Sequence, residues 1–163
     1  MTKLLSPFSR LKLKNRLIMA PMTRCFADPI GHPAPELGKY YIERARGGVG
    51  LIIVESCAVN NADACGYVNG CQLCLESHAA KWRPIVEEVK KYGTQIWVQL
   101  FHAGRLTVPE ISNGRPIASS ELVPGGSNSF WRPELNGEIV HFQTLTPYVK
   151  PRTASPQDIS RIS

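Results

Sequence analysis

Two short apolar runs in this chain each end abruptly in polar side chains. Residues 17–19 read Leu-Ile-Met and lead into Pro-Met-Thr at 21–23, while residues 96–98 read Ile-Trp-Val and lead into Gln99. A hydroxyl can donate to a carbonyl oxygen, and an amide offers both donors and an acceptor. Parallel barrels carry their chemistry at the carboxyl ends of the strands. The two junctions therefore indicate a ligand site shared between strands.

Each of these residues also has a purely structural interpretation. Thr23 could simply cap the turn after its strand. Gln99 lies within an apolar strand, so it could be a core glutamine whose amide is satisfied by the backbone. Glu55 follows a third apolar run and could be a general base, although such a glutamate more often pairs with an internal arginine.

Four of the five cysteines, Cys57, Cys65, Cys71 and Cys74, fall within one short region. The last two have the C-x₂-C spacing that zinc sites use, but no second such pair or H-x₃-H completes a ligand set. Free thiols packed among apolar groups are therefore favoured, and no metal site is predicted. The odd number of cysteines favours a reducing, cytoplasmic compartment.

Hydrophobic periodicity predicts strands that alternate with helices. This order predicts parallel pairing with right-handed crossovers, and hence an α/β fold. The expected elements are a short strand at 11–14 that leads into the next one, strands at 16–21, 49–54 and 94–101, and helices at 36–46 and 76–92.

Residues 105–151 contain many prolines and glycines and show no convincing periodicity. We expect a long loop that caps the mouth of a barrel, with a small hairpin around 138–142. Ser155, Pro156 and Asp158 then predict a capped helix start. Because the chain ends at Ser163, we expect residues 1–163 to be a partial barrel domain, truncated at the start of its third helix.

Length and charge exclude several other classes of protein. The 163 residues fall short of the ~250 of a complete (β/α)₈ barrel. The formal charge of +6 is scattered, with no run of four basic residues, so we predict no nucleic-acid partner. No apolar run approaches the ~20 residues of a membrane span, and the N-terminus does not resemble a secretory signal.

Several longer strings resemble the old yellow enzyme family. They are Leu-Lys-Asn-Arg-Leu-Ile-Met-Ala-Pro-Met-Thr-Arg at 13–24, Tyr-Tyr-x-x-Arg-Ala at 40–45, His-Ala-Gly-Arg at 102–105 and Pro-Ile-Ala-Ser-Ser-Glu-Leu-Val-Pro-Gly-Gly at 116–126. The resemblance implies the N-terminal part of a (β/α)₈ TIM barrel, with about three parallel strands and two crossover helices. This sequence departs from the family at Phe101, where some members have tryptophan, and at 70–74, where many have Gly-Ile/Val-Trp.

The resemblance also implies a cofactor and a reaction. FMN would be bound, NADPH or NADH would reduce it, and hydride would pass to an activated alkene such as an enone. The family's proton-donating acid and substrate-anchoring residues are expected beyond this chain. The alternative is an inactive half-barrel that needs self-association or a complementing chain to form a flavin site. By carry-over, the residues that contact the flavin are Pro21, Met22, Thr23, Ser56 and Gln99, with Thr23 tuning the flavin through a ring carbonyl.

Overall fold

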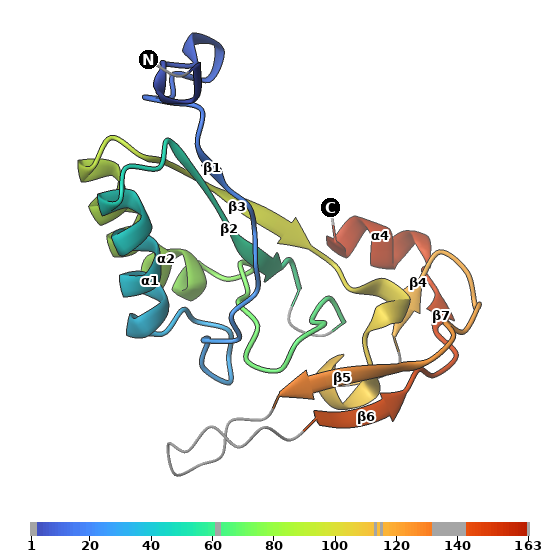
Figure 1. Cartoon of the computed structure of the whole chain (residues 1–163). Coiled ribbons are helices and arrows are strands. Elements are labelled where there is room, and N and C mark those ends of the chain that lie inside the picture. The colour runs from blue at the N-terminus through green and yellow to red at the C-terminus, as the bar shows by residue number, and fades with distance from the viewer. Residues whose placement is uncertain (1–2, 61–62, 113, 115, 132–142, 163) are drawn as a thin grey trace.

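A three-stranded parallel sheet covered by two helices forms the first half of the molecule (Figure 1). The computed structural model describes residues 3–60, 63–112, 114, 116–131 and 143–162. The sheet has the order β1-β2-β3, so β1 and β3 are its edges. Its elements are β1 (Ile18–Met19), α1 (Pro35–Arg46), β2 (Leu51–Ala58), α2 (Glu76–Lys91) and β3 (Gln95–Phe101).

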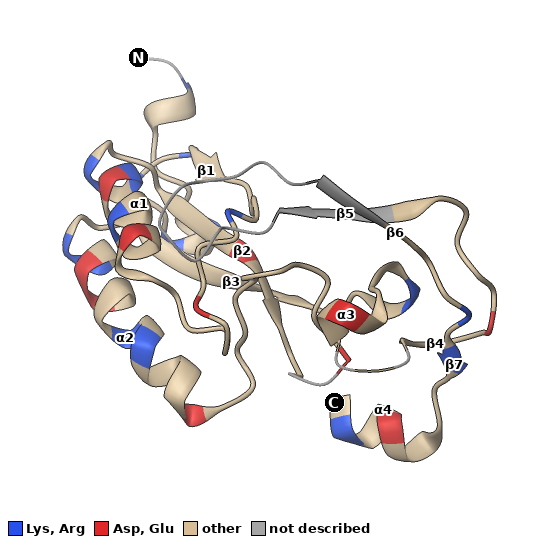
Figure 2. Cartoon of the chain, turned by 90° about the horizontal axis from the view of Figure 1, so that it is seen from below, with Lys and Arg blue, Asp and Glu red and all other residues tan. Residues whose placement is uncertain are grey.

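The predicted α/β alternation is confirmed, because both strand pairs are parallel and each crossover contains a helix. The helix–sheet core contains Leu37 and Tyr41 of α1, both fully buried, and Ile52 and Val54 of β2. Full burial of one such aliphatic side chain stabilises the fold by about 1.5–3 kcal/mol. Figure 2 shows charged residues on α1 and α2, whereas β3 carries none.

Local sequence explains where α1 begins and ends. Pro35 is its first residue, a position where the missing N–H of proline costs nothing. After the helix, Gly48 has φ +97 and its N–H donates to the carbonyl of Ala45. A residue with a side chain would be strained in this left-handed conformation, so the two glycines at 47–48 end the helix.

The N-terminus of α2 is capped by an unexpected residue, the buried His78. Its Nδ1 accepts the backbone N–H groups of Cys74 at 3.3 Å and Leu75 at 3.2 Å. Its Nε2 lies 2.8 Å from the carbonyl oxygen of Ile30. Because Nδ1 accepts, Nε2 must carry the proton, and the ring is held in one neutral tautomer. His78 thus ties α2 to the loop before α1.

The segment after β3 contains more regular structure than the sequence predicted. Its short elements lie beyond the carboxyl ends of β2 and β3 (Figure 1). The hairpin predicted around 138–142 lies outside the described residues, but two paired antiparallel strands flank it. Proline and glycine interrupt the periodic spacing of apolar residues, so the sequence gives no pattern from which such short elements could be predicted. The elements are η3 (Gly104–Leu106), α3 (Pro109–Ser112), β4 (Ile117–Ala118) paired in parallel with β7 (Arg152–Thr153), and β5 (Ser127–Trp131) paired with β6 (Gln143–Pro147).

Near the N-terminus, the short strand considered at 11–14 is not formed. The chain instead makes two 3₁₀ turns, η1 (Lys3–Leu5) and η2 (Ser9–Leu11), and a single bridge between Phe8 and Leu13. Lys12 ends η2 with φ +53. A left-handed residue turns the chain sharply, so it interrupts the extended backbone that a strand needs.

The last helix, α4 (Pro156–Ile162), has the predicted cap. The Ser155 N–H donates to Asp158 Oδ2 at 2.8 Å, and the Asp158 N–H donates to Ser155 Oγ at 3.2 Å. Arg152 binds the same carboxylate with two nitrogens at 2.6 and 2.9 Å. This guanidinium, together with the Ser155 donors, holds the pKa of Asp158 far below its ordinary range. No helix in the described ranges has the length and apolar character to cross a membrane.

Candidate functional site

A β-bulge at the carboxyl end of β2 organises the candidate site. Val54 pairs with Val98 of β3, but the next pair is Ser56 with Gln99, so Glu55 is an extra residue. Ser56 and Gln99 are therefore direct neighbours across the two strands. The segment that leaves β1 brings Thr23 to the same place, where its Oγ1 lies 2.9 Å from Ser56 Oγ.

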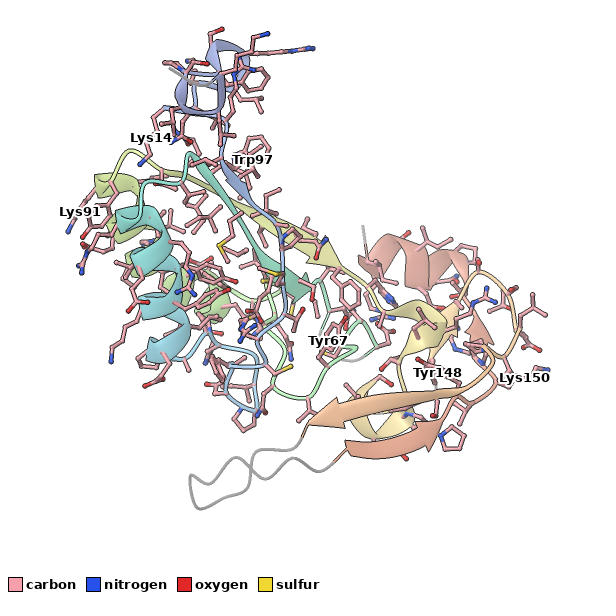
Figure 3. All side chains as sticks on the ribbon, in the orientation of Figure 1. Lys14, Tyr67, Lys91, Trp97, Tyr148 and Lys150 are labelled. Atoms are coloured by element: carbon pink, nitrogen blue, oxygen red, sulfur yellow. The ribbon has the colours of Figure 1, made fainter. Side chains whose placement is uncertain are left out.

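The site lies on the face of the sheet opposite the helices. Met19 and Ile96 pack against the helix-side core, so their neighbours Ile18 and Trp97 project from the other face. Ile18 is 50% exposed and Trp97 is 47% exposed, and Trp97 is labelled in Figure 3. In a closed barrel this face is the interior.

Gln99 also projects from this open face, two residues after Trp97. The alternative of a core glutamine satisfied by the backbone does not hold, because the side chain is exposed. No hydrogen bond to it occurs among the described residues. Its amide therefore has its donors and acceptor free for a ligand.

Glu55 points the other way, into the buried interface with α1. Its Oε2 accepts the Tyr41 hydroxyl and the backbone N–H of Arg24, both at 3.3 Å, and the Tyr41 hydroxyl in turn accepts the Glu55 N–H at 3.0 Å. Burial raises the pKa of the Glu55 carboxyl, although these donors oppose the shift. Glu55 contacts the backbone of Arg24 and not its guanidinium, which lies over the Tyr40 ring. This orientation does not favour a general base, and the carboxylate instead fixes the loop that carries Thr23.

Pro21 and Met22 connect β1 to Thr23. Pro21 is partly exposed and Met22 is 50% exposed. Proline cannot donate to a sheet ladder, so the strand ends here and the chain turns across the mouth of the sheet. The five predicted contact residues thus fall in two groups. Thr23, Ser56 and Gln99 lie together, and Pro21 and Met22 form the approach to them.

Residues 102–105, His-Ala-Gly-Arg, hold the segment that follows β3 in place. His102 Nδ1 accepts the Gly104 N–H at 3.0 Å, and its Nε2 lies 3.5 Å from Oδ1 of the buried Asp63. Asp63 also binds Arg161 of α4 at 2.6 Å. Arg105 donates to Ser120 Oγ at 3.0 Å. Sequence reasoning missed Asp63, whose partner on α4 is 98 residues away and leaves no local signal.

The cysteines do not form a ligand cluster in the described part of the chain. Cys57 and Cys71 are buried in the helix–sheet core, and the Cys74 sulfur lies 3.7 Å from His78 Nδ1. No three histidine, cysteine or acidic side chains of the described residues come together as metal ligands. All five cysteines are free thiols. Contact with the Cys57 side chain, together with burial, raises the pKa of Cys71, which argues against a thiolate there.

The donor set of the site fits the polar edge of a flavin. The pyrimidine part of the isoalloxazine ring presents carbonyl acceptors on either side of an N–H donor. The free Gln99 amide can meet such an alternating edge, and the Thr23 hydroxyl can meet a carbonyl. Ser56 is small, so a ring can approach the backbone closely at that position.

The fold is that of one part of the (β/α)₈ barrel flavin enzymes. The whole described fold superimposes on morphinone reductase in complex with tetrahydroNAD with a TM-score of 0.82 and 31% identity. The match covers 99% of this chain and 43% of that structure. A homologue of old yellow enzyme from Zymomonas mobilis matches with a TM-score of 0.77 and 27% identity, covering 99% of this chain and 42% of that one.

The model of the NADH:flavin oxidoreductase / NADH oxidase family matches residues 3–159, so the chain belongs to this family. An NADH oxidase of Thermoanaerobacter brockii is 41% identical over 115 residues, which cover 69% of this chain and 17% of the relative. The chain thus spans only a minor part of the length of this relative. The predicted resemblance to old yellow enzymes is confirmed.

Proposed function

We propose that this chain forms the flavin-facing part of an FMN-dependent oxidoreductase that takes hydride from NADPH or NADH and reduces activated alkenes such as enones. The observation that carries the proposal is the convergence of Thr23, Ser56 and Gln99. They come from three separate segments and meet at the carboxyl end of a parallel sheet, where barrel enzymes bind their ligands.

Each residue has a definite task in this proposal. A bound flavin supplies the hydride-transfer chemistry. Thr23 donates its hydroxyl proton to a ring carbonyl, and Gln99 holds the alternating edge of the ring with its amide. Pro21 and Met22 would supply backbone against which the ring could pack. Glu55 acts from the opposite face, because its carboxylate fixes the Arg24 N–H and thereby the Thr23 loop.

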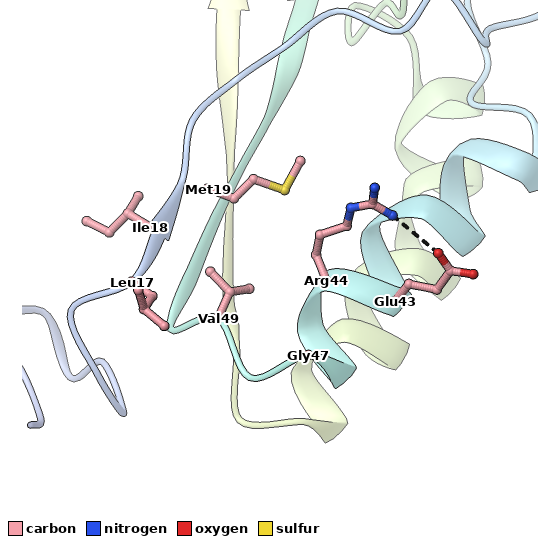
Figure 4. A pocket seen from close by; sticks show the side chains of 7 residues that line it. All are labelled: Leu17, Ile18, Met19, Glu43, Arg44, Gly47 and Val49. Atoms are coloured by element: carbon pink, nitrogen blue, oxygen red, sulfur yellow. Dashed lines mark hydrogen bonds and ion pairs between the residues drawn. The ribbon is translucent and has the colours of Figure 1, made fainter. Parts of the chain in front are cut away.

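We further propose that the edges and the open face of the sheet bind a segment that completes the barrel, either from the same protein or from a second chain. Both edge strands and the exposed Trp97 support this proposal, since unpaired edges readily pair with another chain. A groove of about 490 Å³ runs beside the free edge of β1, between Met19 and the Arg44–Glu43 ion pair of α1 (Figure 4). Without that segment the chain would be an inactive half-barrel.

A reducing, cytoplasmic setting fits this proposal. The five cysteines are free thiols, and three of them are buried. Buried thiols can remain reduced where glutathione and thioredoxin are present.

FMN titration of the purified chain, with its mass in solution measured on the same sample, tests the proposal. Saturable binding that is weakened in Gln99→Ala is expected. Gln95→Ala is the matched control, because Gln95 lies on the same strand and the same face as Gln99, at the opposite end. Equal FMN binding by both variants would remove Gln99 from the site. A folded chain that binds no FMN, alone or self-associated, would reject the chain as an autonomous flavin-binding unit.

A further inference from the structure

We propose that Ser56 and Thr23 form a hydroxyl relay, in which Ser56 donates to Thr23 so that the only hydroxyl proton of Thr23 is directed at a flavin carbonyl. The inference rests on the proposed function and assigns Ser56 a task beyond being small. Ser56 becomes a positioning residue for the group that touches the flavin.

The contact itself is short and sheltered. Ser56 Oγ lies 2.9 Å from Thr23 Oγ1, and Ser56 is only 5% exposed. Neither hydroxyl has another hydrogen bond to any described residue. The two side chains therefore satisfy each other, and the pair has one proton left over for a third group.

The surroundings of the two hydroxyls determine which of them donates its proton to a third group. Thr23 is the more exposed partner and lies on a loop at the open face, whereas Ser56 is buried within β2. A carbonyl oxygen can approach Thr23 more easily than Ser56. With such an acceptor in place, Thr23 donates outward and Ser56 donates to Thr23 Oγ1. Hydrogen bonds in such a chain polarise one another and strengthen each bond by about 10–30%.

Two adjacent side chains of β2 hold the loop that carries Thr23. Ser56 contacts Thr23, and the preceding residue, Glu55, accepts the N–H of Arg24 at 3.3 Å. Two consecutive residues of β2 thus hold two consecutive residues of the loop. A loop hydroxyl held in this way needs little reordering when a ligand binds, and preorganisation of this kind favours affinity.

The relay predicts a specific pattern of FMN binding. Ser56→Ala removes the donor to Thr23 and should weaken FMN binding by about two- to tenfold, the range that one neutral hydrogen bond contributes. It should also shift the flavin midpoint potential in the negative direction, because a less polarised donor stabilises the reduced ring less. In a Thr23→Val background, Ser56→Ala should have no further effect.

The experiment measures FMN affinity and flavin midpoint potential for Ser56→Ala, Thr23→Val, the double variant and Thr23→Ser. Thr23→Ser keeps the hydroxyl and should remain close to the wild-type chain. Ser6→Ala is the control, because Ser6 has an exposed hydroxyl that bonds to Lys3 within the N-terminal turn and to Arg16.

Three results would overturn the relay. They are an unchanged potential in Ser56→Ala, equal effects of Ser56→Ala in both backgrounds, and Ser56→Ala behaviour matching that of Ser6→Ala. In each case the wild-type chain still binds FMN, so the proposed function stands. Failure of a folded wild-type chain to bind FMN, alone or self-associated, would overturn the relay and would reject the chain as an autonomous flavin-binding unit.

Discussion

Tyr41→Phe is the sharpest test of the buried Glu55 cluster. The Tyr41 hydroxyl donates to Glu55 Oε2 at 3.3 Å and accepts the Glu55 N–H at 3.0 Å. Both residues are fully buried, so water cannot replace the missing hydroxyl. The variant keeps the aromatic ring and its packing, and its effect therefore reports the two hydrogen bonds.

The expected cost has a part that depends on pH and a part that does not. An unsatisfied buried N–H costs about 1–3 kcal/mol at any pH. When Glu55 is ionised, the loss of a donor to the carboxylate adds about 1.5 kcal/mol, the lower end for charged groups because 3.3 Å is long. We therefore expect a loss of about 2.5–4.5 kcal/mol where Glu55 is ionised and about 1–3 kcal/mol where it is protonated.

The sign follows from proton linkage. Burial raises the pKa of Glu55 in the folded chain above its ordinary value of about 4.3. The folded state therefore binds this proton more tightly than the unfolded state, and stability falls as pH rises from the ordinary pKa through the raised one. Removal of a donor to the carboxylate raises the folded pKa of Glu55 further, so the penalty must grow with pH.

Urea denaturation of the wild-type chain and Tyr41→Phe at pH 5 and pH 8 measures both parts. Tyr40→Phe is the matched control, because Tyr40 is the preceding residue on α1 and its ring lies 3.7 Å from the Arg44 guanidinium rather than against Glu55. A penalty that is equal at the two pH values, or larger at pH 5, would refute the account of Glu55.

Three further substitutions test the helix caps and a strained turn. His78→Ala should lower the free energy of unfolding by about 2–4 kcal/mol in urea denaturation, because the N–H groups of Cys74 and Leu75 and the carbonyl of Ile30 lose their partner. The pKa of Asp158 is lowered in the folded state, so its bond to Arg152 contributes stability above pH ~4 that is lost as pH falls. Asp158→Asn should therefore flatten the acid side of a thermal-unfolding pH profile. Gly31→Ala should lower the free energy of unfolding by more than about 1 kcal/mol. Gly31 has φ +88, and a Cβ added there would lie 2.4 Å from a side-chain carbon. A Cβ added at Gly114, by contrast, would have nothing within 4 Å.

The layer of helices and strands was predictable because its pattern is local. The helix predicted at 36–46 is observed at Pro35–Arg46, and the one predicted at 76–92 is observed at Glu76–Lys91. Apolar residues at helical spacing mark the buried face of each helix, and glycines mark the ends. The strands predicted at 16–21, 49–54 and 94–101 are observed at Ile18–Met19, Leu51–Ala58 and Gln95–Phe101, because each contains a continuous apolar run.

The tertiary features were not predictable from such patterns. Asp63 joins His102 and Arg161, and nothing in its immediate sequence signals either partner. Gln99 is flanked by apolar residues, which suggests burial, but the open face of the sheet leaves it exposed. The apolar residues of the strands mark positions that a closed barrel would bury, whereas the described residues form only part of such a barrel.

The bulge in β2 explains why Ser56 belongs to the site at all. In a regular strand Ser56 would share the face of Ile52 and Val54, which pack against the helices. The extra residue resets this alternation, so Cys57 joins the helix-side core and Ser56 pairs with Gln99 on the open face. The same irregularity turns the carboxylate of Glu55 toward Tyr41 and away from the site. One inserted residue thus places the Ser56 hydroxyl beside Thr23 on the open face and the Glu55 carboxylate on the helix side, and both contact the segment that carries Thr23.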